Sequence, residues 1–215
     1  MKPFAVRLVN LVFGLILYSL GIVFSIKANI GYAPWEVFHV GLASKAGFSI
    51  GTASILTGIV VVAVIMFFGE KIGLGTILNM LLIGIFIDLI FIANIIPKQE
   101  KLLPGIIMLV TGLFVISLGS YFYIKTGFGA GPRDSLMVLL NRKTKLPVGL
   151  CRSMVEFSVT FSGWFLGGMV GIGTVISVIA IGFFIQFTFA VLKFSPAAVI
   201  HETIKETIGG LLKRR

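Results

Sequence analysis

Two short stretches of this chain combine glycine, proline and an acidic residue in the same order. Residues 31–36 read Gly-Tyr-Ala-Pro-Trp-Glu, and residues 129–134 read Gly-Ala-Gly-Pro-Arg-Asp. Glycine permits a sharp turn, proline suits the first position of a helix, and an acid two residues later suits its positive end. Each stretch therefore predicts a turn followed by a short helix, over 34–45 and 132–143. Backbone N–H groups at such helix starts are suited to binding a ligand.

The two stretches belong to a longer internal repeat. Residues 14–88 match residues 112–186 at 24 of 75 positions without a gap. A second copied motif is Gly-Leu-Gly-Thr at 73–76, which recurs as Gly-Ile-Gly-Thr at 171–174. This motif predicts a tight turn with a threonine cap on the helix that follows.

The composition places the repeat in a membrane. The 215-residue chain is 57% hydrophobic and 12% charged, with a mean hydropathy of +1.09, which is typical of a membrane protein. A helix needs about 20 apolar residues to cross a bilayer. Segments of this kind lie at 8–26, 51–68, 76–96, 105–124, 153–170 and 174–194. The predicted division is a first membrane repeat over 1–98, a second over 99–195 and a tail over 196–215.

Three spans in each half give the expected symmetry. Since three is odd, the second half begins on the opposite side of the membrane, and the repeats are inverted. The expected fold is all-α and polytopic, with about six transmembrane helices in two inverted three-helix repeats, each with a short extra loop-helix. Inverted repeats are common in secondary transporters, which bind their substrates where the halves meet. The alternative is that duplication only enlarged a membrane bundle.

The basic residues are unevenly distributed. With the N-terminus inside, the outer loops hold Lys27, Lys45, Lys98 and Lys101, and the other fourteen of the 18 lysines and arginines lie inside. Cytoplasmic loops are enriched in these residues, so both termini are expected to be cytoplasmic. The net charge of +10 then indicates topology and attraction to anionic lipid at the inner surface, and not nucleic acid. The tail over 196–215 predicts an amphipathic basic helix on that surface, with a disordered tail as the alternative.

The short helices have two open interpretations, because about 12 residues cannot cross a bilayer. They either lie at the membrane interface or dip into the bundle, where their N-termini approach a shared cavity from opposite faces. Trp35 stands at the position equivalent to Arg133 and suits an interface anchor. Arg133 either holds an anion, pairs with Asp134, or follows the excess of positive charge inside.

Polar residues within the apolar spans are candidates for an ion or proton path, since a charge at membrane depth is costly. Asp88 lies in the third span, and its equivalent in the repeat is Gln186. Glu156 lies one helical turn after Arg152, so a local ion pair competes with a functional role. The residues expected to bind a substrate or ion are Gly31, Pro34, Trp35, Glu36, Asp88, Gly129, Gly131, Pro132, Arg133, Asp134, Glu156 and Gln186.

The motifs together resemble those of the bacterial YczE/YyaS/YitT family of integral membrane proteins. The residues that carry the resemblance are Gly31-x-Ala33-Pro34-Trp35-Glu36, Lys71 to Thr76 with Asp88 downstream, Gly129-x-Gly131-Pro132-x-Asp134-Ser135 and Gly171-x-Gly173-Thr174. The resemblance extends over residues 8–194 and is to the short YczE-type branch, which lacks the YitT-type soluble C-terminal domain. It implies a multi-pass protein of the bacterial plasma membrane and carries over no substrate or mechanism.

Three functional classes can be compared. A transporter or channel-like protein for an unidentified small solute or ion is favoured by the inverted repeats, the paired short helices and the acid within a span. The alternative is a non-catalytic accessory or regulatory protein that binds a partner protein, and a homo-oligomer is also open. An enzyme is least favoured, because no catalytic, metal-ligand or phosphate-loop pattern occurs. We therefore expect no catalytic residue, no metal and no cofactor.

Overall fold

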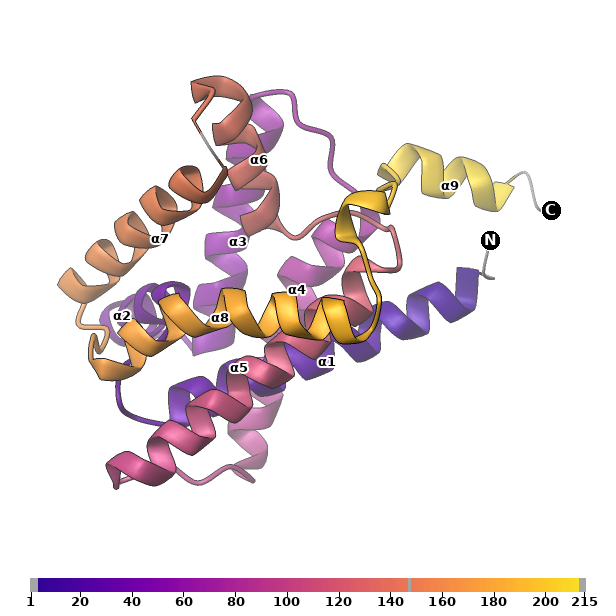
Figure 1. The fold of residues 1–215 in the computed structure, drawn as a ribbon. Helices are drawn as coiled ribbons and strands as arrows, with labels where there is room; N and C mark the ends of the chain where they lie inside the picture. Colours follow the sequence, from indigo (N-terminus) through magenta and orange to yellow (C-terminus); the bar gives the residue numbers. More distant parts are fainter. Residues whose placement is uncertain (1–3, 147, 213–215) are drawn as a thin grey trace.

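The computed structural model describes residues 4–146 and 148–212, and this part of the chain is all-helical. The helices are α1 (Phe4–Lys27), α2 (Pro34–Ala46), α3 (Ile50–Phe67), α4 (Leu74–Ala93), α5 (Leu102–Ile124), α6 (Pro132–Thr144), α7 (Val148–Phe165), α8 (Ile172–Val191), the 3₁₀ turn η1 (Pro196–Ala198) and α9 (Ile204–Leu212) (Figure 1). The two predicted short helices are confirmed as α2 and α6. Each has its proline at the start, as the sequence predicts.

Five of the described helices are long and apolar enough to cross a membrane, namely α1, α3, α4, α5 and α8. The expected fifth span, at 153–170, corresponds to α7, which is not among these five. Its residues include Arg152 and Glu156, whose charges lower its hydropathy. An all-helical membrane architecture is therefore supported, whereas a crossing by α7 stays a prediction.

Several contacts between helices recur at equivalent positions of the two halves. Helices α1 and α5, the first of each half, pack against each other and lie side by side in Figure 1. Helix α1 also packs on α4, and its equivalent α5 packs on α8. Helix α2 contacts α7 from the other half, while α6 contacts α3. Each of these pairs becomes the other when the halves are exchanged. The contacts therefore follow the internal repeat of the sequence.

Backbone hydrogen bonds connect the halves at equivalent positions. The N–H of Gly75 donates to the carbonyl of Phe128 at 2.7 Å, and the N–H of Gly173 donates to the carbonyl of Ile30 at 2.8 Å. Each bond ties the loop before a short helix to the start of the last long helix of the other half. The predicted threonine cap is also present, because Thr76 Oγ1 accepts from the N–H of Gly73 at 3.3 Å. These bonds fix where α2 and α6 begin.

The C-terminal tail differs from the expected continuous helix. A single 3₁₀ turn follows Ser195, and the helix begins only at Ile204. The reason is that the intervening backbone bonds to other loops, with the Glu202 N–H donating to the Gly127 carbonyl at 2.7 Å. Arg7 Nη1 also lies 2.7 Å from Glu202 Oε1, so the described ends of the chain lie together (Figure 1). The basic residues 213–215 lie outside the described residues.

The start of α9 is stabilised by a reciprocal pair of side chains. The backbone N–H of Thr203 donates to Glu206 Oε2 at 2.7 Å, and the Thr203 hydroxyl donates to the same oxygen at 2.8 Å. These hydrogen bonds favour the ionised carboxylate and lower the pKa of Glu206. The arrangement is a capping box, which satisfies N–H groups at the first turn of a helix.

Candidate functional site

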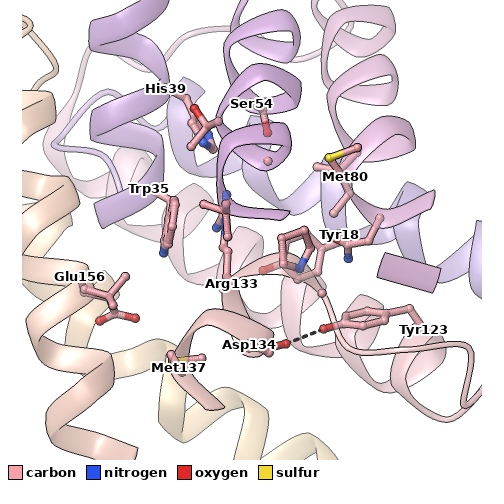
Figure 2. Close-up of a pocket in the computed structure, with 18 of the residues that line it drawn as sticks. Tyr18, Trp35, His39, Ser54, Met80, Tyr123, Arg133, Asp134, Met137 and Glu156 are labelled. Atoms are coloured by element: carbon pink, nitrogen blue, oxygen red, sulfur yellow. Dashed lines mark hydrogen bonds between the residues drawn. The ribbon is translucent and has the colours of Figure 1, made fainter. Parts of the chain in front are cut away.

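A polar cavity of about 100 Å³ lies where the two halves meet (Figure 2). Its lining residues come from the seven helices α1 to α7 and from the loop before α6. They are Tyr18, Trp35, His39, Ser54, Thr57, Gly58, Val61, Asn79, Met80, Ile83, Tyr123, Gly131, Pro132, Arg133, Asp134, Met137, Arg152, Val155 and Glu156. A cavity of this size and polarity has room for several waters or a small solute.

The first turns of the two short helices meet at this cavity. Trp35 and Arg133 are the second residues of α2 and α6, and they are equivalent in the repeat. The guanidinium carbon of Arg133 lies 4.7 Å from the centre of the Trp35 ring, which is a cation–π contact (Figure 2). The two helix starts therefore do not lie apart at opposite surfaces. Side chains from the first turn of each short helix therefore line the same space.

Arg133 has a poorly matched partner. Its Nη2 lies 3.6 Å from Glu36 Oε1, a distance too long for a good hydrogen bond. Glu36 is only 4% exposed, so burial of its charge requires a nearby cation. Asp134, which follows Arg133 in the chain, accepts a hydrogen bond from the Tyr123 hydroxyl at 2.9 Å (Figure 2). Asp134 is thus held by Tyr123, while the Arg133 side chain lines the cavity with its N–H donors.

A second arginine faces the cavity beside its own carboxylate. Arg152 Nε donates to Glu156 Oε1 at 2.8 Å, so the expected ion pair one helical turn apart is present. Both residues line the cavity, and so does Gly58, the equivalent of Glu156 in the first half. The lining thus carries two arginines and two carboxylates. The helix ends add partial positive charge to this balanced set.

The structure brings together only part of the expected set. Trp35, Gly131, Pro132, Arg133, Asp134 and Glu156 line the polar cavity. Glu36 contacts Arg133 from behind, and Pro34 faces a separate groove. Gly31 lies against Gly171, and Gly129 lies against Gly73, where the loops cross. These two glycines position the short helices without facing the cavity.

Asp88 and Gln186, the two polar residues predicted within the apolar spans, lie outside the polar cavity. Asp88 is not part of the cavity lining, and Gln186 is exposed on α8. The Asp88 carboxylate accepts from the N–H of Gly51 at 2.8 Å and from the hydroxyl of Ser49. It therefore satisfies donors at the start of α3, where Ser49 is the N-cap. This capping explains an acid at this depth without an ion path.

We expect Asp88→Ala to destabilise the fold and to leave ligand affinity unchanged. Removing the capping carboxylate should cost about 1–2 kcal/mol of unfolding free energy. The measurement is the thermal unfolding midpoint of the purified protein in detergent. Glu100→Ala is the matched control, because Glu100 is an exposed carboxylate in a loop. Equal midpoints for the two variants would contradict the capping role.

Sequence reasoning missed several cavity residues. Tyr18 and Tyr123 are tyrosines within apolar spans, and that position was the available signal, since a buried hydroxyl needs a partner. His39 is only 2% exposed and lies on α2 next to the ring of Trp35. No spacing rule connects α2 with α7, so their joint contribution appears only in three dimensions. Among the described residues, no group of histidine, cysteine and carboxylate side chains is arranged to hold a metal.

Comparison with known proteins relates the chain to bacterial membrane proteins. It is 36% identical over 177 residues to the uncharacterized membrane protein YczE of Bacillus subtilis (strain 168), covering 81% of each chain. An uncharacterized protein of Haemophilus influenzae is 33% identical over 177 residues, covering 82% of this chain and 80% of the relative. YyaS of Bacillus subtilis is 29% identical over 168 residues, covering 77% and 83%.

These relatives confirm the resemblance to YczE and YyaS that the glycine-proline-acid motifs predicted. The name of the first relative also agrees with the apolar helices of the structure. No solved structure gives a significant match. The sequence model of the family described as "Family of unknown function (DUF6198)" matches residues 5–190, and the chain therefore belongs to this family.

Proposed function

We propose that the protein is a non-catalytic transport protein for a small anionic solute, bound in the polar cavity between the halves. The observation that carries this proposal is the position of Arg133 at the meeting point of two helix N-termini. A guanidinium provides several N–H donors in a planar fork that matches a carboxylate or phosphate. The helix ends add further N–H groups and positive potential.

The surrounding carboxylates support an anion and not a simple cation as the solute. Asp134 is in the first turn of α6, where an acid is favoured by the helix itself, and it accepts the Tyr123 hydroxyl. Glu156 is paired with Arg152. Each lining carboxylate thus has a local partner, whereas the contact of Arg133 with Glu36 is long, at 3.6 Å. An entering anion would accept hydrogen bonds from the Arg133 guanidinium.

The proposed topology has six crossings in two inverted repeats, with α7 as the fifth. Both termini would face the cytoplasm from the plasma membrane, as the distribution of lysine and arginine predicts. The ion pair between Arg7 and Glu202 supports placing the two ends of the chain on one side. The cavity would then open alternately to the two sides as the halves rearrange around it.

We expect Arg133→Gln to raise the anion concentration needed for transport. Loss of one charge-assisted recognition group should weaken anion binding by about 10-fold to 100-fold. The measurement is the current across a supported membrane of proteoliposomes after concentration jumps of small carboxylates and inorganic phosphate. Arg142→Gln is the matched control, since Arg142 lies on the same helix but pairs with Glu70 at 2.8 Å, away from the cavity.

The result also separates the alternative function. An accessory protein that binds a partner would show no anion-dependent current in the parent protein. It would instead co-purify with a defined membrane partner at fixed stoichiometry. Equal currents from the Arg133 and Arg142 variants would show that the solute is not held by Arg133, and the proposed site would then be wrong.

A further inference from the structure

An apolar groove of about 320 Å³ lies between α7 and α8. It is lined by Pro34, Ser153, Glu156, Phe157, Thr160, Val170, Thr174, Val175, Val178 and Ile179. Val178 is 49% exposed and Ile179 is 73% exposed, although both are apolar. In a membrane protein such side chains face hydrocarbon, so the groove is open toward the lipid.

The groove corresponds to a contact that is closed in the first half. There, α3 packs directly on α4, and a Cβ atom at Gly84 would lie 2.5 Å from the Ile55 side chain. The equivalent of Gly84 is Gly182, which would have no neighbouring atom within 4 Å of such a Cβ. The equivalent of Ile55 is Ser153, a smaller side chain that lines the groove. The smaller side chain of Ser153 therefore accounts for part of the separation of α7 and α8.

A second pair of positions shows the same divergence. In the first half the Met80 side chain covers Gly58, where an added Cβ would lie 2.5 Å from Met80 Cγ. Their equivalents are Val178 and Glu156, and both line the groove. A shorter side chain has replaced the methionine, and a carboxylate has replaced the glycine. The contact that covers Gly58 in the first half is therefore missing in the second half, and a carboxylate is added to the lining of the groove.

The groove and the polar cavity share a boundary. Glu156 lines both spaces, so they meet at its side chain. On α2, Pro34 lines the groove, while the next residue, Trp35, lines the cavity. A molecule that extends past Glu156 would therefore place one end beside Arg133 and Trp35 and the other end among the apolar side chains of α7 and α8.

We propose that the groove binds the hydrocarbon chain of an amphiphile whose anionic head group binds Arg133 in the polar cavity. The inference rests on the proposed function and assigns its substrate class. A lipid-facing space lined by apolar side chains is filled by hydrocarbon, since water there would lack hydrogen-bond partners. A cavity of about 150 Å³ accommodates a benzene-sized ligand. The groove has about twice that volume, which suits several carbons of a hydrocarbon chain. Arg133 and the helix ends supply the charge complementary to an anionic head.

The test uses Trp35 as the reporter of occupancy. The chain has two tryptophans, so Trp164→Phe leaves Trp35 alone. The full-length Trp164→Phe protein is placed in lipid nanodiscs and titrated with 2-bromododecanoate, whose bromine is next to the carboxylate and would quench the fluorescence of Trp35 beside the bound head group. We expect saturable quenching that acetate competes away, and much weaker quenching by the uncharged brominated dodecanol.

A groove-filling variant provides the decisive comparison. Val178→Phe should weaken the apparent affinity for the brominated dodecanoate by about 10-fold, because the added ring overfills the groove. Val64→Phe is the matched control, as Val64 is 39% exposed on α3 and lines neither space. Acetate should protect equally well in both variants, since it occupies only the cavity.

Two results would overturn the inference. Unchanged affinity in Val178→Phe, with acetate competition intact, would show that the chain does not use the groove while the anion site of the proposed function stands. Equal quenching by the alcohol and the carboxylate would show that the head group is not recognised as an anion. By contrast, a lack of response to every anion in the parent and in Arg133→Gln would reject the proposed function itself.

Discussion

Gly21→Leu should prevent the protein from accumulating in a folded form. The α1–α5 contact has glycines on both helices, and a Cβ at Gly21 would lie 2.5 Å from the carbonyl oxygen of Gly112. The same atom would lie 2.8 Å from the backbone nitrogen of Ile116. Small residues allow helix backbones to approach closely in a membrane, and a backbone neighbour cannot move aside as a flexible side chain can. We expect a loss on the order of 3 kcal/mol or more.

The position of Gly21 explains why the loss would be global. Helices α1 and α5 join the two halves, and buried residues of both helices, such as Leu15 and Leu113, belong to the central core. Separating them would also separate the packed pair α1 and α4 from the packed pair α5 and α8. The damage would therefore reach the cavity, although Gly21 does not line it.

The measurement is the size-exclusion profile and unfolding midpoint of the solubilised protein, compared with Gly182→Leu. Gly182 is the matched control because it is also a glycine within an apolar helix, and a Cβ there has nothing within 4 Å. The control should remain monodisperse, with an unchanged or slightly raised midpoint, since leucine is the better helix former. A monodisperse Gly21→Leu protein with the midpoint of the control would contradict the close packing of α1 and α5.

Local sequence rules predicted the elements well because their signals are local. Apolar runs gave the long helices to within a few residues, and the prolines at 34 and 132 gave the starts of α2 and α6. The internal repeat gave the equivalence of the halves, and the contacts of α1 with α4 and of α5 with α8 follow it, whereas the packing of α3 on α4 has no contact of similar extent between the described residues of α7 and α8. These features depend on neighbours in the chain or on a fixed offset, both of which a sequence displays directly.

The site was only partly predictable, because it depends on contacts between distant segments. Arg133 was recognised by its contrast with Trp35, but only the packed structure shows that the two side chains touch. For Asp88 the depth in a span indicated an ion path, which stays a prediction, and the structure adds that its hydrogen-bond partners are Ser49 and Gly51 at a helix start. A hydrogen bond across 37 residues has no local signature.

Gly129→Ala should cost more stability than an alanine at a left-handed glycine that faces open space, such as Gly69. Gly129 has a backbone φ of +125, a conformation that residues other than glycine rarely adopt. A Cβ there would also lie 2.8 Å from Thr76 Oγ1 and 2.9 Å from Gly73 Cα. The backbone strain alone costs about 1–3 kcal/mol, and the crossing of the two loops adds a clash with backbone.

The clash would also reach Arg133. Thr76 Oγ1 donates to the carbonyl of Ala130 at 2.6 Å, and this bond holds the residues just before α6. Displacing Thr76 would release the start of α6 and shift the guanidinium relative to Trp35. We therefore expect Gly129→Ala to lower anion affinity together with the unfolding midpoint, and the Trp35 fluorescence assay measures the first while thermal unfolding measures the second.

Gly69→Ala separates backbone strain from the loop crossing. Gly69 has φ +80, and a Cβ there would meet no atom within 4 Å, so this variant carries the strain without the clash. It should lower the midpoint modestly and leave anion affinity unchanged. If both variants lost equal stability and neither lost affinity, the contact between Gly129 and Gly73 would not position α6. The placement of Arg133 would then have to come from the packing of α6 on α3, α7 and α4.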